Sequence, residues 1–151
     1  MNKLLFSPFL FALASCNVFA LNPAVSEAPD NQKLFLSEAI VQTPYSALVK
    51  HTQVDVEEHD EFMSRHVYYA DVIETVRGNI RKRIKYSMLV ERDEEPVLDT
   101  SPAIVTLCFY NGAYYWPGTG AQFDGEPELI RFAKAEAEKA DAKQSEFAQC
   151  D

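Results

Sequence analysis

Three histidines, His51, His59 and His66, lie close together in the sequence, and five acidic residues are interspersed between positions 55 and 61. Imidazole and carboxylate groups are ligands that zinc and similar divalent ions prefer. If this segment forms a hairpin, its two arms bring the histidines toward one another. Their spacing matches no compact metal-binding motif, however, and an acidic loop is commonly only solvated. The cluster therefore leaves two interpretations open, a divalent metal site and an ordinary solvated turn.

A second candidate site is a concentration of aromatic residues around Asn111-Gly112. These residues are Phe109, Tyr110, Tyr114, Tyr115 and Trp116. Such rings can stack on a sugar or a peptide, although in a small barrel they more often fill the core. Asn and Gly both accept positive φ, which the central positions of a type I′ turn require. The pair therefore predicts a tight hairpin between two strands.

This hairpin fixes which aromatic rings share a face. With a two-residue loop, Tyr110 lies opposite Ala113, and the register follows along both strands. One face then forms a core layer of Val105, Leu107, Phe109, Tyr114 and Trp116. The other face carries Thr106, Cys108, Tyr110, Ala113 and Tyr115, and it needs a cover. Tyr110 and Tyr115 are therefore the candidate ligand-binding residues.

The cysteines indicate an oxidising compartment. Cys16 lies in the N-terminal region, which leaves Cys108 and Cys150 as an even pair. A disulfide between them would stabilise the domain by roughly 4 kcal/mol in the chain-entropy model. The alternative is two unrelated thiols.

The N-terminus has the layout of a signal peptide, which we assign to residues 1–20. Lys3 is followed by an apolar run from Leu4 to Ala14, too short for a membrane span, which needs about 20 residues. Cleavage after Val18-Phe19-Ala20 would give a chain that starts at Leu21. The segment Leu13-Ala14-Ser15-Cys16 is instead similar to a bacterial lipobox, in which Cys16 becomes lipidated. Both routes predict export, to the periplasm or to an outer-membrane tether in a Gram-negative source.

Charge and motifs exclude several classes of function. Removing residues 1–20 takes away Lys3 and no acidic residue, so the net charge falls from −9 to −10. Such a surface disfavours nucleic acid, because binding requires clustered basic residues. The sequence has no Gly-x-Ser-x-Gly motif, no cysteine in a reactive setting and no glycine-rich phosphate loop. An enzyme is thus less expected than a binding protein, and no cofactor is predicted apart from the metal considered above.

The remaining sequence predicts a single β-rich domain over residues 33–151, after an exposed lead-in at 21–32. A short helix is expected at residues 33–41. Strands are expected at 47–56, 67–76, 80–91, 103–110 and 113–116. In the third of these, Arg81, Arg83 and Lys85 share one face, which we interpret as solvated. An apolar stripe from Leu129 to Ala140 predicts a C-terminal helix that starts near Asp124, runs toward Cys150 and covers the face of Cys108.

This order of elements resembles the netrin-like module. The resemblance also rests on Val72-Ile73-Glu74-Thr75-Val76-Arg77-Gly78 at the end of the second strand and on a Cys before the strand of Tyr114 and Tyr115. That module is the OB-type barrel of the tissue inhibitors of metalloproteinases and of related bacterial exported proteins. The resemblance covers roughly residues 36–148. It implies a mainly β, or α+β, fold: a five-stranded antiparallel OB-like barrel with a short N-terminal and a C-terminal helix.

The inhibitory chemistry of that family is not implied. Its inhibitors bind the protease zinc through the amine and carbonyl of a free N-terminal Cys, whereas this mature chain would start at Leu21 or at an acylated Cys16. What the resemblance implies is an exported binding or structural module of the cell envelope, whose partner is an envelope protein or a small ligand. The alternative is a metal-dependent hydrolase that uses His51, His59 and His66.

Overall fold

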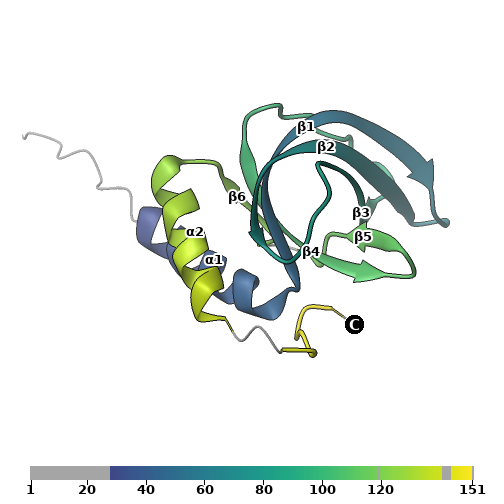
Figure 1. The fold of residues 1–151 in the computed structure, drawn as a ribbon. Helices are drawn as coiled ribbons and strands as arrows, with labels where there is room; N and C mark the ends of the chain where they lie inside the picture. Colours follow the sequence, from purple (N-terminus) through teal and green to yellow (C-terminus); the bar gives the residue numbers. More distant parts are fainter. Residues whose placement is uncertain (1–27, 119, 141–143, 151) are drawn as a thin grey trace, which may run out of the picture.

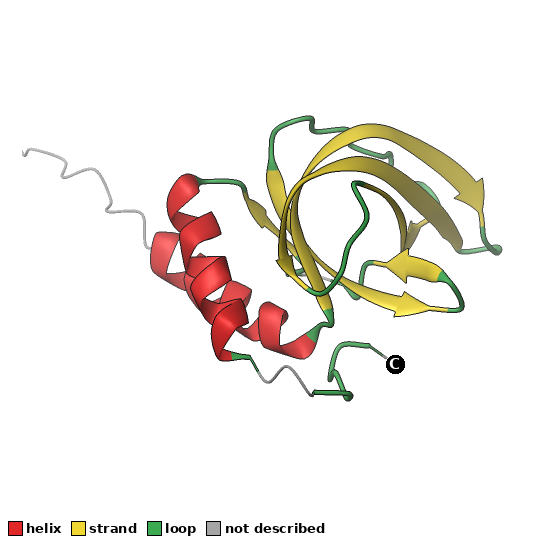
Figure 2. Ribbon diagram, in the orientation of Figure 1, coloured by secondary structure: helices red, strands yellow, loops and turns green. Residues whose placement is uncertain are grey.

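The computed structural model describes residues 28–118, 120–140 and 144–150. Its elements follow in the order α1 (Ala28–Gln42), β1 (Tyr45–Glu58), β2 (Met63–Arg77), β3 (Arg83–Glu91), β4 (Ala103–Tyr110), β5 (Ala113–Tyr115), β6 (Gln122–Asp124) and α2 (Pro127–Lys139). The strands curl into a barrel, and the two helices lie side by side against one flank of it (Figure 1; Figure 2). The predicted signal peptide, with Cys16, lies outside the described residues.

The barrel closes because β1 pairs with both β2 and β4. The ring runs β1-β2-β3-β5-β4 and returns to β1, while β6 adds to the edge of β4. The predicted mainly β fold with a five-stranded barrel and two flanking helices is therefore confirmed. The prediction that all strands pair antiparallel is wrong for one pair, since β3 and β5 run parallel. In a ring of five strands the direction cannot alternate at every contact, so one pairing has to be parallel.

The hairpin predicted at Asn111-Gly112 has the expected geometry. Asn111 and Gly112 have φ values of 49° and 84°, as a type I′ turn requires. Tyr110 faces Ala113 and Cys108 faces Tyr115, which is the predicted register. The first six residues of β4 are buried, because one face of the strand lines the barrel and the other lies beneath the helices and, at Cys108, beneath the C-terminal segment. This explains why its sequence is almost continuously apolar.

Two hydrophobic clusters stabilise the fold. The first fills the barrel, where Val49, Ile84, Val105 and Leu107 pack together. The second lies between the outer face of the barrel and the helices. Its buried members are Leu36, Ala39, Ile40, Leu48, Ile104, Phe123, Leu129 and Ala133. The cover of the outer face of β4 is thus made by both helices, not by α2 alone.

The C-terminal segment differs from the prediction. Helix α2 ends at Lys139 and does not approach Cys150; instead, residues 144–150 form an irregular tail. The helix also starts later than expected, with Glu126 as its N-cap, because Asp124 belongs to β6, a strand that was not predicted. At the other end, α1 begins at Ala28 and so includes part of the expected lead-in.

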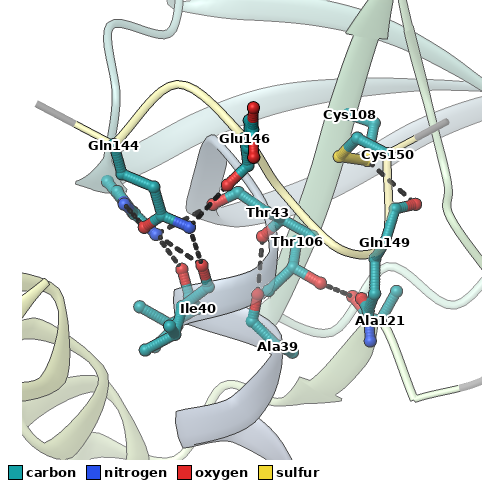
Figure 3. Close-up of a disulfide and its surroundings, with 12 residues drawn as sticks. Ala39, Ile40, Thr43, Thr106, Cys108, Ala121, Gln144, Glu146, Gln149 and Cys150 are labelled. Carbon is teal, nitrogen blue, oxygen red and sulfur yellow. Dashed lines mark hydrogen bonds between the residues drawn. A yellow bond between two sulfur atoms is a disulfide. The ribbon is translucent and has the colours of Figure 1, made fainter. Parts of the chain in front are cut away.

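Arg77 and a disulfide hold this tail in place. The Arg77 guanidinium donates hydrogen bonds to the carbonyls of Val41 and Thr43 at the end of α1, and to the side-chain oxygen of Gln144. The Gln144 amide in turn donates to the carbonyl of Val41 at 3.0 Å. Beyond it, Cys150 is bonded to the buried Cys108, with 5.5 Å between their Cα atoms (Figure 3). The tail, rather than a helix, therefore covers Cys108.

Candidate functional site

The three histidines considered as metal ligands are not brought together. His51 and His66 are buried in the barrel, whereas His59 lies in the exposed turn between β1 and β2, where Arg65 contacts its Nδ1 at 3.1 Å. Across the residues that the structure describes, no three His, Cys, Asp or Glu side chains form a group that could hold a metal. The hairpin predicted to gather them does form, but its tip projects His59 away from the other two.

His51 instead belongs to a polar group inside the barrel. Its Nε2 lies 2.7 Å from the hydroxyl of Tyr86, and its ring makes an edge contact with Tyr68 at 5.4 Å. Burial raises the pKa of Tyr86, so this hydroxyl stays protonated and can donate to a neutral imidazole. Burial lowers the pKa of His51, although a hydrogen bond to the backbone of Asp99 and the charge of that residue partly oppose the shift. The neutral form of His51 is therefore the native one.

This environment predicts a loss of stability in acid. In the unfolded chain His51 takes up a proton near pH 6.5, but its pKa in the folded protein is lower. The unfolded state therefore binds more protons as the pH falls below about 6.5, and stability decreases there. We expect His51→Gln to flatten this decrease by up to about 1.4 kcal/mol per pH unit. Urea unfolding of the wild type and the variant between pH 7.5 and pH 5 measures the pH dependence of the free energy of unfolding.

His59→Gln is the matched control for this measurement, because His59 is exposed in the turn. The control should keep the wild-type pH dependence. An identical pH dependence in His51→Gln, His59→Gln and the wild type would contradict the role assigned to His51.

A large groove opens where β3 meets the β4–β5 hairpin. It encloses about 1430 Å³. The first lining group comes from β3 and the segment before it: Asn79, Arg81, Arg83, Ile84, Lys85, Tyr86, Ser87 and Leu89. The second comes from the hairpin and the residues that follow it, and includes Phe109, Tyr110, Tyr114, Tyr115 and Trp116. The volume exceeds that of most small-molecule pockets, roughly 300–1,000 Å³, and suits a longer ligand.

The groove is basic although the chain is acidic. Its lining includes four of the 14 Lys and Arg residues, Arg65, Arg81, Arg83 and Lys85, but one of the 23 Asp and Glu residues, Glu57. Two of these cations have acidic neighbours: Arg65 lies 3.6 Å from Glu57, and Arg83 lies 3.0 Å from Asp71. Both pairs are largely exposed, so they are weak and can open to a ligand. The groove therefore offers concentrated positive charge.

The candidate ligand-binding residues Tyr110 and Tyr115 both line this groove. The Tyr110 side chain is 64% exposed. Phe109, which the register places in the core, is 47% exposed and makes edge contacts with Tyr45 and Tyr114 at the end of the barrel. The prediction of a buried Phe109 is thus wrong, because β4 extends beyond its last pairing with β1, at Leu107.

Two of the basic residues lie near aromatic rings, Arg81 near Tyr114 in the groove and Lys85 near Tyr69 of β2 beside it. Burial and the neighbouring Tyr45 raise the pKa of Tyr114, while the positive charge of Arg81 acts in the opposite direction. The ammonium group of Lys85 lies 5.7 Å from the centre of the Tyr69 ring. Cations placed near aromatic faces provide a surface that attracts anionic groups and also contacts flat apolar ones.

The sequence pattern predicts a solvated face at Arg81, Arg83 and Lys85, and these residues are exposed. In the structure the same residues also border the groove, which the pattern does not predict. Their alternation in an otherwise acidic chain was the available signal. No sequence signal indicated that Arg65 would lie with them, because its position depends on the pairing of β2 with β3.

Comparisons of the chain with protein-family models, curated protein sequences and solved structures found no match. None of the helices in the described ranges is long and apolar enough to cross a membrane.

Proposed function

We propose that this chain is an exported binding module of the cell envelope, which holds its ligand in the groove between β3 and the β4–β5 hairpin. The observation that carries the proposal is the composition of this groove. Four basic side chains and the exposed rings of Phe109 and Tyr110 gather there, on a chain whose net charge is −9. Exposed aromatic and basic residues in one concave surface are typical of binding sites.

Binding is better supported than catalysis. Among the described residues that line the groove there is no His or Cys, and the single carboxylate, Glu57, is paired with Arg65. General acid–base catalysis or metal binding would require more titratable groups within reach of one another. The histidines of the hydrolase alternative lie elsewhere, two inside the barrel and one at the hairpin tip. Export itself rests on the signal-peptide pattern of residues 1–20 and on the Cys108–Cys150 disulfide.

Site-specific photocrosslinking in the source cells tests this function. A photoreactive phenylalanine analogue is placed at Tyr110 in the groove, and in a second variant at Phe62, which is 74% exposed in the β1–β2 turn. We expect a discrete crosslinked product in the envelope fraction from position 110 and not from position 62. Equal products from both positions, or none from position 110, would contradict the groove as the binding site.

A further inference from the structure

Strand β5 covers only a short part of β3. The parallel pairing comprises Tyr86 with Tyr114 and Ser87 with Tyr115, and the Trp116 N–H then donates to the carbonyl of Ser87 at 2.8 Å. Before Tyr86, the residues of β3 pair with β2 alone, as far as the described chain extends. The stretch Arg83–Lys85 therefore presents an open strand edge toward the hairpin. Such an edge has main-chain N–H and C=O groups available for another strand.

The side chains along this edge alternate in character. Arg83 and Lys85 are exposed on one face, whereas Ile84 between them is buried on the other. All three line the groove. Residues two apart on a strand lie about 6.6 Å from each other, and a neighbouring strand has the same repeat. An extended chain beside β3 would therefore meet positive charge at every second residue and an apolar surface at the residues between.

We propose that the groove binds an extended acidic peptide, which adds as a short strand beside Arg83–Lys85. Acidic residues at alternate positions of this peptide lie across from Arg83 and Lys85, where directly opposed pairs are about 5 Å apart. The intervening side chains are apolar and point toward Ile84 and the ring of Tyr114. This inference rests on the proposed function, because it specifies the ligand of the same groove. The recognition pattern is acidic–apolar–acidic.

The surrounding charges favour this edge over the other open edge of the barrel. Strand β1 pairs with β4 only from Tyr45 to Val49, so its later residues also lack a second neighbour strand within the described structure. Past Val49 this strand carries three acidic residues, Asp55, Glu57 (which also borders the groove) and Glu58, against one lysine, Lys50, so it is less favourable for an acidic peptide. A uronic-acid polymer would satisfy Arg83 and Lys85 but would leave the main-chain groups of β3 unpaired. A peptide strand satisfies both.

A five-residue fluorescent peptide with the order Glu-Val-Glu-Val-Glu is the probe, and fluorescence anisotropy of the folded protein is the measurement. We expect saturable binding that weakens with added salt, because the contacts to Arg83 and Lys85 are charged. A peptide of the same composition ordered Glu-Glu-Glu-Val-Val should bind at least about tenfold more weakly, since it breaks the alternation. Methylation of alternate peptide nitrogens should weaken binding similarly, since it removes the main-chain donors.

Two charge-reversal variants test whether the peptide binds at the edge of β3. Lys85→Glu should weaken binding by about tenfold or more, which is the size expected when a charged partner is replaced. Lys50→Glu makes the same charge change on an exposed strand position outside the groove and is the matched control. It should bind the peptide about as tightly as the wild type does. Thermal unfolding of both variants checks that they are folded.

Three outcomes would overturn the proposal: no binding of the alternating peptide, equal binding of the block-ordered or N-methylated peptide, or tighter binding of an oligogalacturonate or of an oligothymidylate. These outcomes differ from a failure of the proposed function. If position 110 crosslinks to a ligand while the peptide does not bind, the groove is the binding site and the ligand class is wrong. If neither occurs, both proposals fail.

Discussion

Cys108→Ser is expected to lower the free energy of unfolding by about 2–5 kcal/mol under oxidising conditions, as is common when a native disulfide is lost from a small exported domain. The Cα atoms of Cys108 and Cys150 are 5.5 Å apart, within the usual range for a disulfide of about 4.4–6.8 Å. Without the bond, the described part of the tail is held by hydrogen bonds, such as that from the N–H of Gln149 to the carbonyl of Gln42, and by the contact of Phe147 with Arg77. Urea unfolding of the oxidised protein measures the change.

Two comparisons distinguish the loss of the disulfide from the effect of placing a hydroxyl at the buried position 108. Cys150→Ser removes the same bond but changes a partly exposed residue, so it should give a similar loss without placing a hydroxyl in the buried position of Cys108. Reduction of the wild type should also have this effect. Alkylation of both cysteines in the folded, oxidised protein would show that no disulfide exists.

Gly78→Ala is expected to destabilise the protein by about 2–5 kcal/mol, because two costs add at this position. Gly78 has a φ of 76°, which side chains other than glycine rarely adopt. A Cβ atom there would lie 2.6 Å from Cδ1 of Tyr45 and 2.7 Å from the carbonyl oxygen of Pro44. The backbone oxygen cannot move without displacing the start of β1. Thermal or urea unfolding measures the change.

Gly112→Ala is the matched control for this substitution. Gly112 has a similar φ of 84°, but no atom lies within 4 Å of an added Cβ. The Gly112→Ala variant should therefore be destabilised only by the cost of placing an alanine at a positive φ, about 1–2 kcal/mol. If the two variants were destabilised equally, the close approach of Pro44 and Tyr45 would not be the cause.

Local patterns predicted the barrel strands well. The Asn111-Gly112 turn fixed the register of β4 and β5, because two positive φ values in sequence suit a type I′ hairpin. The apolar run of β4 correctly indicated burial on both faces. The pairing of Cys108 with Cys150 was predicted from the presence of two remaining cysteines in an oxidising compartment. The prediction that a long C-terminal helix brings them together was wrong. A docked tail, not a helix, carries Cys150.

What the sequence did not predict depends on contacts between distant segments. Strand β6 has three residues, Gln122–Asp124, and exists because they pair with the start of β4. The end of α2 at Lys139 could not be anticipated from a stripe of alanines that continues to Ala140. Arg77 appeared to belong to a turn, yet it donates to the carbonyls at the end of α1 and lies against the ring of Phe147. Neither short strands nor such interactions leave a periodic signal.

The candidate site was predictable in its aromatic part and not in its basic part. The hairpin register pointed to Tyr110 and Tyr115, and both line the groove. The groove itself arises because β5 pairs with only two residues of β3. That parallel contact depends on how β3 and β5 meet when the ring closes, so it cannot be inferred from either strand alone. The histidines were misleading for a similar reason, since the strand pairing separates His59 from His51 and His66.

The open edge of β1 beyond Val49 has a consequence for self-association. A long unpaired strand edge is a template on which other copies can stack and begin to aggregate. Here the edge carries Asp55, Glu57 and Glu58, and Val56 among them is 53% exposed. Repulsion between the acidic edges of two molecules opposes such stacking. We therefore expect these carboxylates to oppose self-association, so that substituting all three with their amides should make the protein precipitate at lower concentrations than the wild type does.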